Sequence, residues 1–150
     1  MIGTALAIGA GVGALGGLFG SLGKRSAIQK QLEGYEVALM GDINKAIKKT
    51  AEWGADQLHT ARAYHDRTGA YSQSWKAKPD GYNKENSKFM TEKYKIYNEK
   101  HYRLTHLLEK GHVGRNGKRV SAYEHIRPVE DLVMQLALSE VQRVIRENAN

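Results

Sequence analysis

Two stretches of the chain place hydrophobic residues at the three- and four-residue spacing of an amphipathic helix. The first runs from Ser26 to about Tyr64, and we expect a break or kink near Gly34 or Gly41. The second begins at Pro128, which suits the first turn of a helix, and continues to the last residues. The apolar faces comprise Ile43, Ile47, Ala51, Gly54, Leu58 and Ala61 in the first helix, and Val129, Leu132, Val133, Leu136, Ala137, Val141, Val144 and Ile145 in the second.

Between these helices, polar and apolar residues alternate roughly, as they do in half-exposed strands. We expect strands at Ser74–Lys78 and Lys93–Asn98, separated by a turn at Pro79–Gly81 and a long polar loop. Tyr102–Glu109 predicts a short helix, and Gly111 is suited to end it because glycine readily adopts the backbone conformation of a helix C-cap. The predicted order is therefore long helix, two strands, short helix and long helix.

We expect the first 23 residues to form a separate hydrophobic arm and residues 24–150 to form the domain. Ile2 to Gly23 carries no charged side chain and holds half of the chain's 16 glycines. As a helix it would be roughly 33 Å long, about the thickness of a bilayer's hydrocarbon core, with Gly9, Gly13 and Gly17 on one stripe. In water, each glycine makes a helix about 1 kcal/mol less stable than an alanine at the same position would. Membrane insertion, burial against neighbouring subunits and a disordered arm all stay open.

Composition removes several kinds of chemistry. The chain has no cysteine, so disulfides, thiolate metal sites and cysteine nucleophiles are excluded. Its six histidines do not have the spacing of metal ligands, and no nucleophile elbow or phosphate-binding glycine loop is present. We therefore expect no enzymatic activity, no cofactor and no metal site.

The net charge of +7 favours negatively charged partners. Lys110, Arg115, Lys118 and Arg119 fall within ten residues that contain no acid. Such a loop can contact nucleic-acid phosphates, but it can equally be a solvated loop or a contact with an acidic neighbouring subunit. The sequence leaves these interpretations open.

Three segments after the first helix follow one another in an order that resembles a known family. They read Asp66-Arg67-Thr68-Gly69-Ala70-Tyr71, then Tyr102-Arg103-Leu104-Thr105-His106-Leu107-Leu108-Glu109-Lys110-Gly111-His112, and then His125-Ile126-Arg127-Pro128. This order is similar to that of the head-tail joining or tail-completion proteins (minor tail components) of lambda-like siphophages. The run from Tyr102 to His112 is the most specific part. Arg67 departs from the pattern, which often has an acid there, and the arm lies outside it.

The resemblance implies an α+β fold in which a long N-terminal helix and a C-terminal helix pack on a small antiparallel sheet. It implies a structural virion protein of the phage neck, made in the host cytoplasm, that forms a homo-oligomeric ring beside neighbouring connector and tail proteins. DNA would pass through this ring with weak, non-specific contact. The basic residues Lys110, Arg115, Lys118 and Arg119 would then face the DNA channel or a subunit interface.

The same resemblance implies structural roles for the motif residues. Thr68 and Gly69 would form a turn that fixes the first helix against the sheet, and His125 and Pro128 would set the angle of the closing helix. The remaining motif residues, Tyr102, Glu109, Gly111 and His112, would shape the short helix and the loop after it. Two alternatives remain: a membrane-inserting or ejected virion protein that uses residues 2–23, and a basic nucleic-acid-binding module.

Overall fold

The computed structural model describes residues 4–6, 27–61, 66–82 and 91–149. The elements in chain order are β1 (Thr4–Leu6), α1 (Ala27–Thr60), a 3-10 turn η1 (Ser72–Ser74), β2 (Trp75–Tyr82), β3 (Glu92–Asn98), α2 (Tyr102–Lys110), β4 (His112–Val113), β5 (Arg119–Val120) and α3 (Ile126–Asn148). Long helices combined with antiparallel strands confirm the predicted α+β class.

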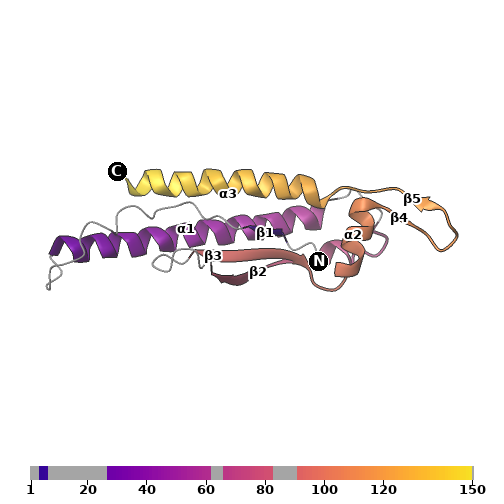
Figure 1. Cartoon of the computed structure of the whole chain (residues 1–150), viewed down its shortest axis with the longest axis horizontal. Coiled ribbons are helices and arrows are strands. Elements are labelled where there is room, and N and C mark those ends of the chain that lie inside the picture. Colours follow the sequence, from indigo (N-terminus) through magenta and orange to yellow (C-terminus); the bar gives the residue numbers. More distant parts are fainter. Residues whose placement is uncertain (1–3, 7–26, 62–65, 83–90, 150) are drawn as a thin grey trace.

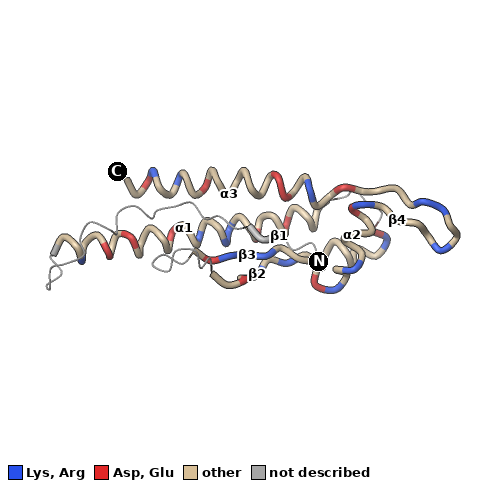
Figure 2. Tube along the Cα trace, in the orientation of Figure 1, with Lys and Arg blue, Asp and Glu red and all other residues tan. Residues whose placement is uncertain are grey.

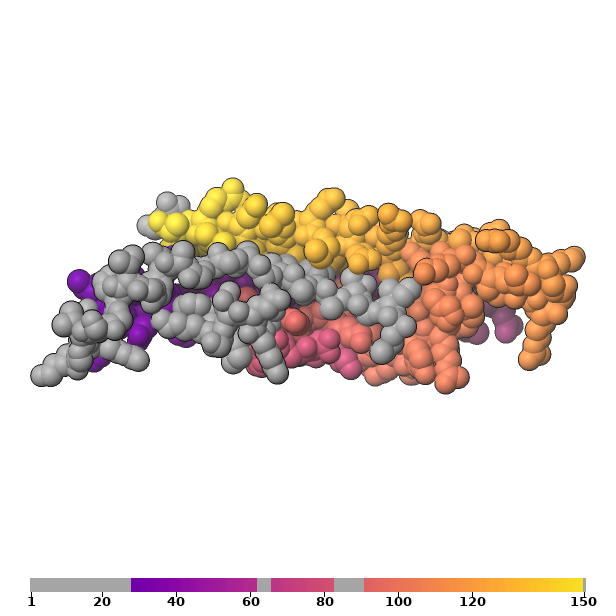
Figure 3. Space-filling model, viewed as in Figure 1, coloured from indigo at the N-terminus to yellow at the C-terminus, as the bar shows by residue number. Residues whose placement is uncertain are grey.

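The described elements form an elongated body in which α1 lies between α3 and the sheet (Figure 1). The sheet has the strand order β1-β3-β2, and both pairings are antiparallel. The two long helices run in opposite directions, and the short β4–β5 hairpin extends beyond them at the end where α2 lies (Figure 1). The space-filling view shows the same narrow outline (Figure 3).

Helix α1 is continuous from Ala27 to Thr60, so the predicted break near Gly34 or Gly41 is wrong. A single glycine lowers helix propensity but keeps its backbone N–H, and only proline both removes that donor and clashes with the preceding turn. The helix also ends at Thr60, earlier than expected, and Tyr64 lies outside the described residues.

The core forms where one face of α1 meets α3 and the inner face of the sheet. Its buried hydrophobic residues are Ile43, Ala46, Ile47, Ala51, Ala55, Leu58, Tyr71, Trp75, Tyr94, Ile96, Ile126, Val129, Val133, Ala137, Val141 and Val144. The predicted face of α3 is only partly right, because Leu132 and Ile145 are 50% and 40% exposed. Successive residues turn by about 100° around a helix, which places these two outside the row that enters the core.

Strand β2 continues through Pro79–Gly81, where the sequence predicted a turn. Pro79 pairs with Tyr94 of β3, and the register shifts between Pro79 and Tyr82. Proline is tolerated because β2 is an edge strand, where the missing N–H can face away from the ladder. Gly81 has a φ of 85°, which accommodates the irregularity.

No described helix is both long and apolar enough to cross a membrane. Thr4–Leu6, which the sequence analysis placed in the arm, form strand β1 and pair with β3. Gly9, Gly13 and Gly17, on which the membrane interpretation of residues 2–23 depends, lie outside the described residues.

Gly54 of α1 lies against side chains of both α3 and β3. A Cβ atom at this position would lie 2.5 Å from Val133 Cγ2 and 2.7 Å from Ile96 Cδ1, whereas one at Gly41 would meet nothing within 4 Å. We expect Gly54→Ala to lower the free energy of unfolding by about 1–3 kcal/mol through overpacking. The matched control Gly41→Ala should raise it by up to about 1 kcal/mol. Denaturant unfolding of both variants measures this, and equal effects would contradict the close packing.

Candidate functional site

The motif residues from Tyr102 to Pro128 converge where α2, the β4–β5 hairpin and the start of α3 meet (Figure 1). At the centre is the Glu109 carboxylate, in the last turn of α2. It accepts hydrogen bonds from the backbone amides of His125 at 2.9 Å, Ile126 at 3.0 Å and Arg127 at 2.9 Å. We call this arrangement the Glu109 junction.

The Glu109 junction explains where α3 begins. The first amides of a helix have no partner within that helix, and here a carboxylate from another helix accepts three of them. Pro128, the next residue, has no N–H to satisfy. The helix therefore starts at Ile126, and Pro128 lies within its first turn. The sequence predicted that the helix would begin at Pro128, two residues later.

Two opposing effects act on the Glu109 carboxyl group. Partial burial raises its pKa, but the bonds from the three backbone amides outweigh burial, so the pKa lies below its ordinary value of 4.5. The charged carboxylate also faces the positive end of the α3 dipole, which favours the ionised form.

His125 connects the Glu109 junction to the core, and its side chain is fully buried. Nδ1 lies 2.7 Å from the carbonyl oxygen of Tyr123 and 3.1 Å from Glu109 Oε2. Since both neighbours accept hydrogen bonds, we assign the proton to Nδ1, and the Tyr71 hydroxyl then donates to Nε2 at 2.9 Å. Glu109, His125 and Tyr71 are thus linked in series, and His125 and Tyr71 are both buried.

Sequence reasoning gave no role to three residues that complete this buried centre, Tyr71, Trp75 and Asn98. The rings of Tyr71, Trp75 and His125 pack edge to face, with centroids 5.7–6.3 Å apart. Buried Asn98 donates to the Tyr71 carbonyl oxygen at 2.8 Å and accepts from the His101 amide at 2.8 Å. Asn98 therefore joins the end of β3 to both η1 and α2. The available signal was an asparagine at the last inward-facing position of the strand, where a hydrophobic residue would be expected.

The turn before the sheet relies more on Asp66 than on Thr68. Asp66 Oδ2 accepts from the amide and hydroxyl of Ser72 at 2.8 and 2.9 Å, and the amide bond is the main reason that the pKa of Asp66 is lowered. Thr68 Oγ1 accepts a longer bond of 3.3 Å from the Ala70 amide. Gly69 has a φ of 71°, as the predicted turn requires.

Gly111 allows the hairpin to fold against the chain that follows it. Its φ is 70°, and a Cβ atom there would lie 2.6 Å from the Val120 carbonyl oxygen. His112 Nδ1 lies 3.4 Å from the Leu107 carbonyl oxygen. Tyr102, in contrast, is exposed, and the Arg103 guanidinium group lies 5.7 Å from the centre of its ring.

The basic hairpin, residues 112–120, extends from the Glu109 junction. Arg115, Lys118 and Arg119 are exposed on it, and Lys110 is exposed at the end of α2, where it meets the hairpin. None of the four forms an ion pair with a described acidic residue. Figure 2 shows these cations gathered at the extended end of the molecule.

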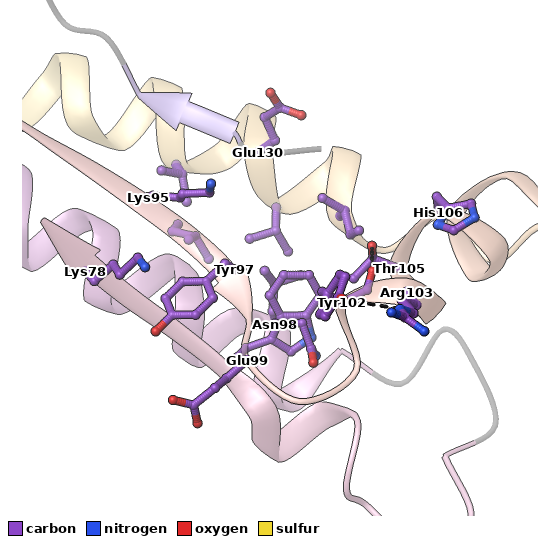
Figure 4. A pocket seen from close by; sticks show the side chains of 16 residues that line it. Lys78, Lys95, Tyr97, Asn98, Glu99, Tyr102, Arg103, Thr105, His106 and Glu130 are labelled. Carbon is purple, nitrogen blue, oxygen red and sulfur yellow. Dashed lines mark hydrogen bonds between the residues drawn. The ribbon is translucent and has the colours of Figure 1, made fainter. Parts of the chain in front are cut away.

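Next to the junction, a cavity of about 570 Å³ lies between β3, α2 and α3. Its apolar wall includes Leu58, Trp75, Ile96, Ile126, Val129 and Val133. Figure 4 shows Lys78 and Lys95 on one side of the cavity and Arg103 and His106 on the other. The indole N–H of Trp75 is buried and has no acceptor among the described residues.

Among the described residues, no three histidine, aspartate or glutamate side chains cluster closely enough to hold a metal ion. No protein-family model, curated protein or solved structure matches the chain.

The lowered pKa of Glu109 gives a pH-dependent prediction. The carboxylate should stabilise the fold fully above pH 4.5, and this contribution should be lost as the pH falls through the lowered value. We expect Glu109→Gln to lower the free energy of unfolding by about 1–3 kcal/mol at neutral pH. The difference from the wild type should shrink under acidic conditions.

Denaturant unfolding across the pH range measures this effect. The control Glu140→Gln removes a carboxylate of α3 that pairs with Arg143 on the surface, and should change the stability by only about 0.5 kcal/mol. A Glu109→Gln deficit that is the same at every pH would show that the carboxylate charge is not what caps α3.

Proposed function

We propose that this chain is a non-catalytic structural subunit of the neck of a tailed phage, a head-tail joining or tail-completion protein that forms a homo-oligomeric ring. The proposal is supported by the way the resembling segments fit together. Glu109 from the second segment and His125 from the third meet in one junction that sets the start of α3. Both side chains are largely buried and bind the backbone at the start of α3, which is typical of a structural role.

The basic hairpin supports a role beside DNA. Arg115, Lys118 and Arg119 extend from the Glu109 junction without acidic partners among the described residues, so their charges are available to phosphates. In a ring, hairpins of this kind would line the passage. A few exposed cations per subunit would attract DNA without specific base contacts, which is compatible with DNA that must move.

A phage that lacks this product tests the assembly role directly. We expect electron microscopy to show separated heads and tails or unstable necks, and light scattering of the purified full-length protein to give a multiple of 16.7 kDa. Intact, fully infectious particles without the product would contradict the proposal, and so would a monomeric protein that is absent from purified virions.

The hairpin gives a separate prediction. We expect binding to duplex DNA to weaken steeply with salt, and Arg115→Gln to reduce the slope of the log-log salt plot by about 0.9 if the side chain contacts one phosphate. Lys49→Gln, which removes an equal charge from the surface of α1, should leave the slope nearly unchanged. Equal slopes for both variants would exclude a specific role of the hairpin. Strong binding by a monomer would instead favour a nucleic-acid-binding module.

A further inference from the structure

The N-terminal part of α1 extends past the end of α3 (Figure 1). The Tyr35 hydroxyl donates to the carbonyl oxygen of Asn148, the last residue of α3, at 2.7 Å. Ile28, Leu32 and Tyr35 are 69%, 50% and 44% exposed. We call residues 27–38 the overhang.

The exposed side chains of the overhang continue the buried face of α1. Ile28, Leu32 and Tyr35 follow the spacing of one helix stripe, and the same stripe enters the core at Ile43. An apolar stripe of this kind usually marks an interaction surface when it is left exposed. The overhang is also acidic, because Glu33 and Glu36 outnumber its single cation, Lys30.

The cavity beside α2 has the complementary character. Its wall is apolar, and its rim carries Lys78, Lys95 and Arg103, none of which pairs with a described acid. Two acidic residues, Glu99 and Glu130, also line the cavity. Glu99 already pairs with Lys76 at 2.6 Å, so Glu130 alone of these two could balance the charge of the rim cations.

Two of the rim lysines repel one another. Lys78 lies directly opposite Lys95 in the β2–β3 register, and like charges in this arrangement destabilise a sheet. The Lys78 ammonium group also lies 4.6 Å from the centre of the Tyr97 ring, a contact that acts against this repulsion. A carboxylate placed between the two lysines would relieve it.

Helix α2 and the start of α3, which line the cavity, lie toward the other end of the long axis from the overhang (Figure 1), so the two surfaces do not meet within one molecule. We propose that the overhang of one copy docks into the cavity of the next, with Leu32 and Tyr35 on the apolar wall and Glu33 and Glu36 near the rim cations. Such a contact is heterologous, and repeated copies form a closed ring when the rotation allows. This inference rests on the self-association in the proposed function and names its interface.

A charge exchange tests this interface. The overhang variant carries Glu33→Lys and Glu36→Lys, and the cavity variant carries Lys95→Glu and Arg103→Glu. In either variant alone, like charges meet at every contact, so we expect association roughly 100-fold weaker than in the wild type. In an equimolar mixture every contact pairs opposite charges again, so light scattering should show assembly recovered. Circular dichroism melting verifies that each variant folds.

Cross-linking provides an independent measurement because the chain has no cysteine of its own. Chains with Leu32→Cys should form a disulfide with chains carrying Arg103→Cys, and not with chains carrying Lys49→Cys on the surface of α1. Three results would overturn the interface. They are association of either charge variant alone as strong as that of the wild type, no recovery of assembly in the mixture, and equal cross-linking of Leu32→Cys to both partner cysteines. If the wild type still assembles, the proposed function survives that result. A monomeric wild type would refute both.

Discussion

The position of α3 depends on one carboxylate. Glu109 belongs to a different helix, yet it accepts the amides with which α3 begins, and its pKa is lowered because those amides favour the charged form. The same carboxylate contacts His125, whose ring reaches Tyr71 and the aromatic packing around Trp75. The core, the closing helix and the base of the hairpin are therefore fixed together, and a change at this point is felt in all three.

The parts of the fold that follow from regular spacing could be predicted from the sequence. The apolar rows of α1 and α3 and the alternation in β3 predicted these elements in the right order, because an element that buries one face has hydrophobic residues at regular spacing. The starts and ends of these elements depend on tertiary contacts. Helix α3 begins before Pro128 because of a residue in another helix, and β2 passes through Pro79 because nothing pairs with its outer edge among the described strands.

The candidate site was predictable only in part. Glu109, Gly111 and His125 could be singled out because they belong to recognisable segments, but neither the three amide bonds nor the burial of His125 is visible in a linear pattern. Asn98 and Trp75 were missed because their importance comes from neighbours distant in sequence. The cavity has no local signal at all, since its wall draws on α1, β2, β3, α2 and α3.

The outer edge of the sheet limits how copies of this chain can meet. Lys76, Lys78 and Pro79 occupy β2, and an edge that carries positive charge and lacks one amide is a poor template for a strand from another molecule. Uncontrolled growth of a continuous sheet from one copy to the next is thereby discouraged, even when the chain is highly concentrated. If copies of this chain assemble as proposed, this restriction favours contacts through helix surfaces, which have a fixed geometry and can stop at a finite number of subunits.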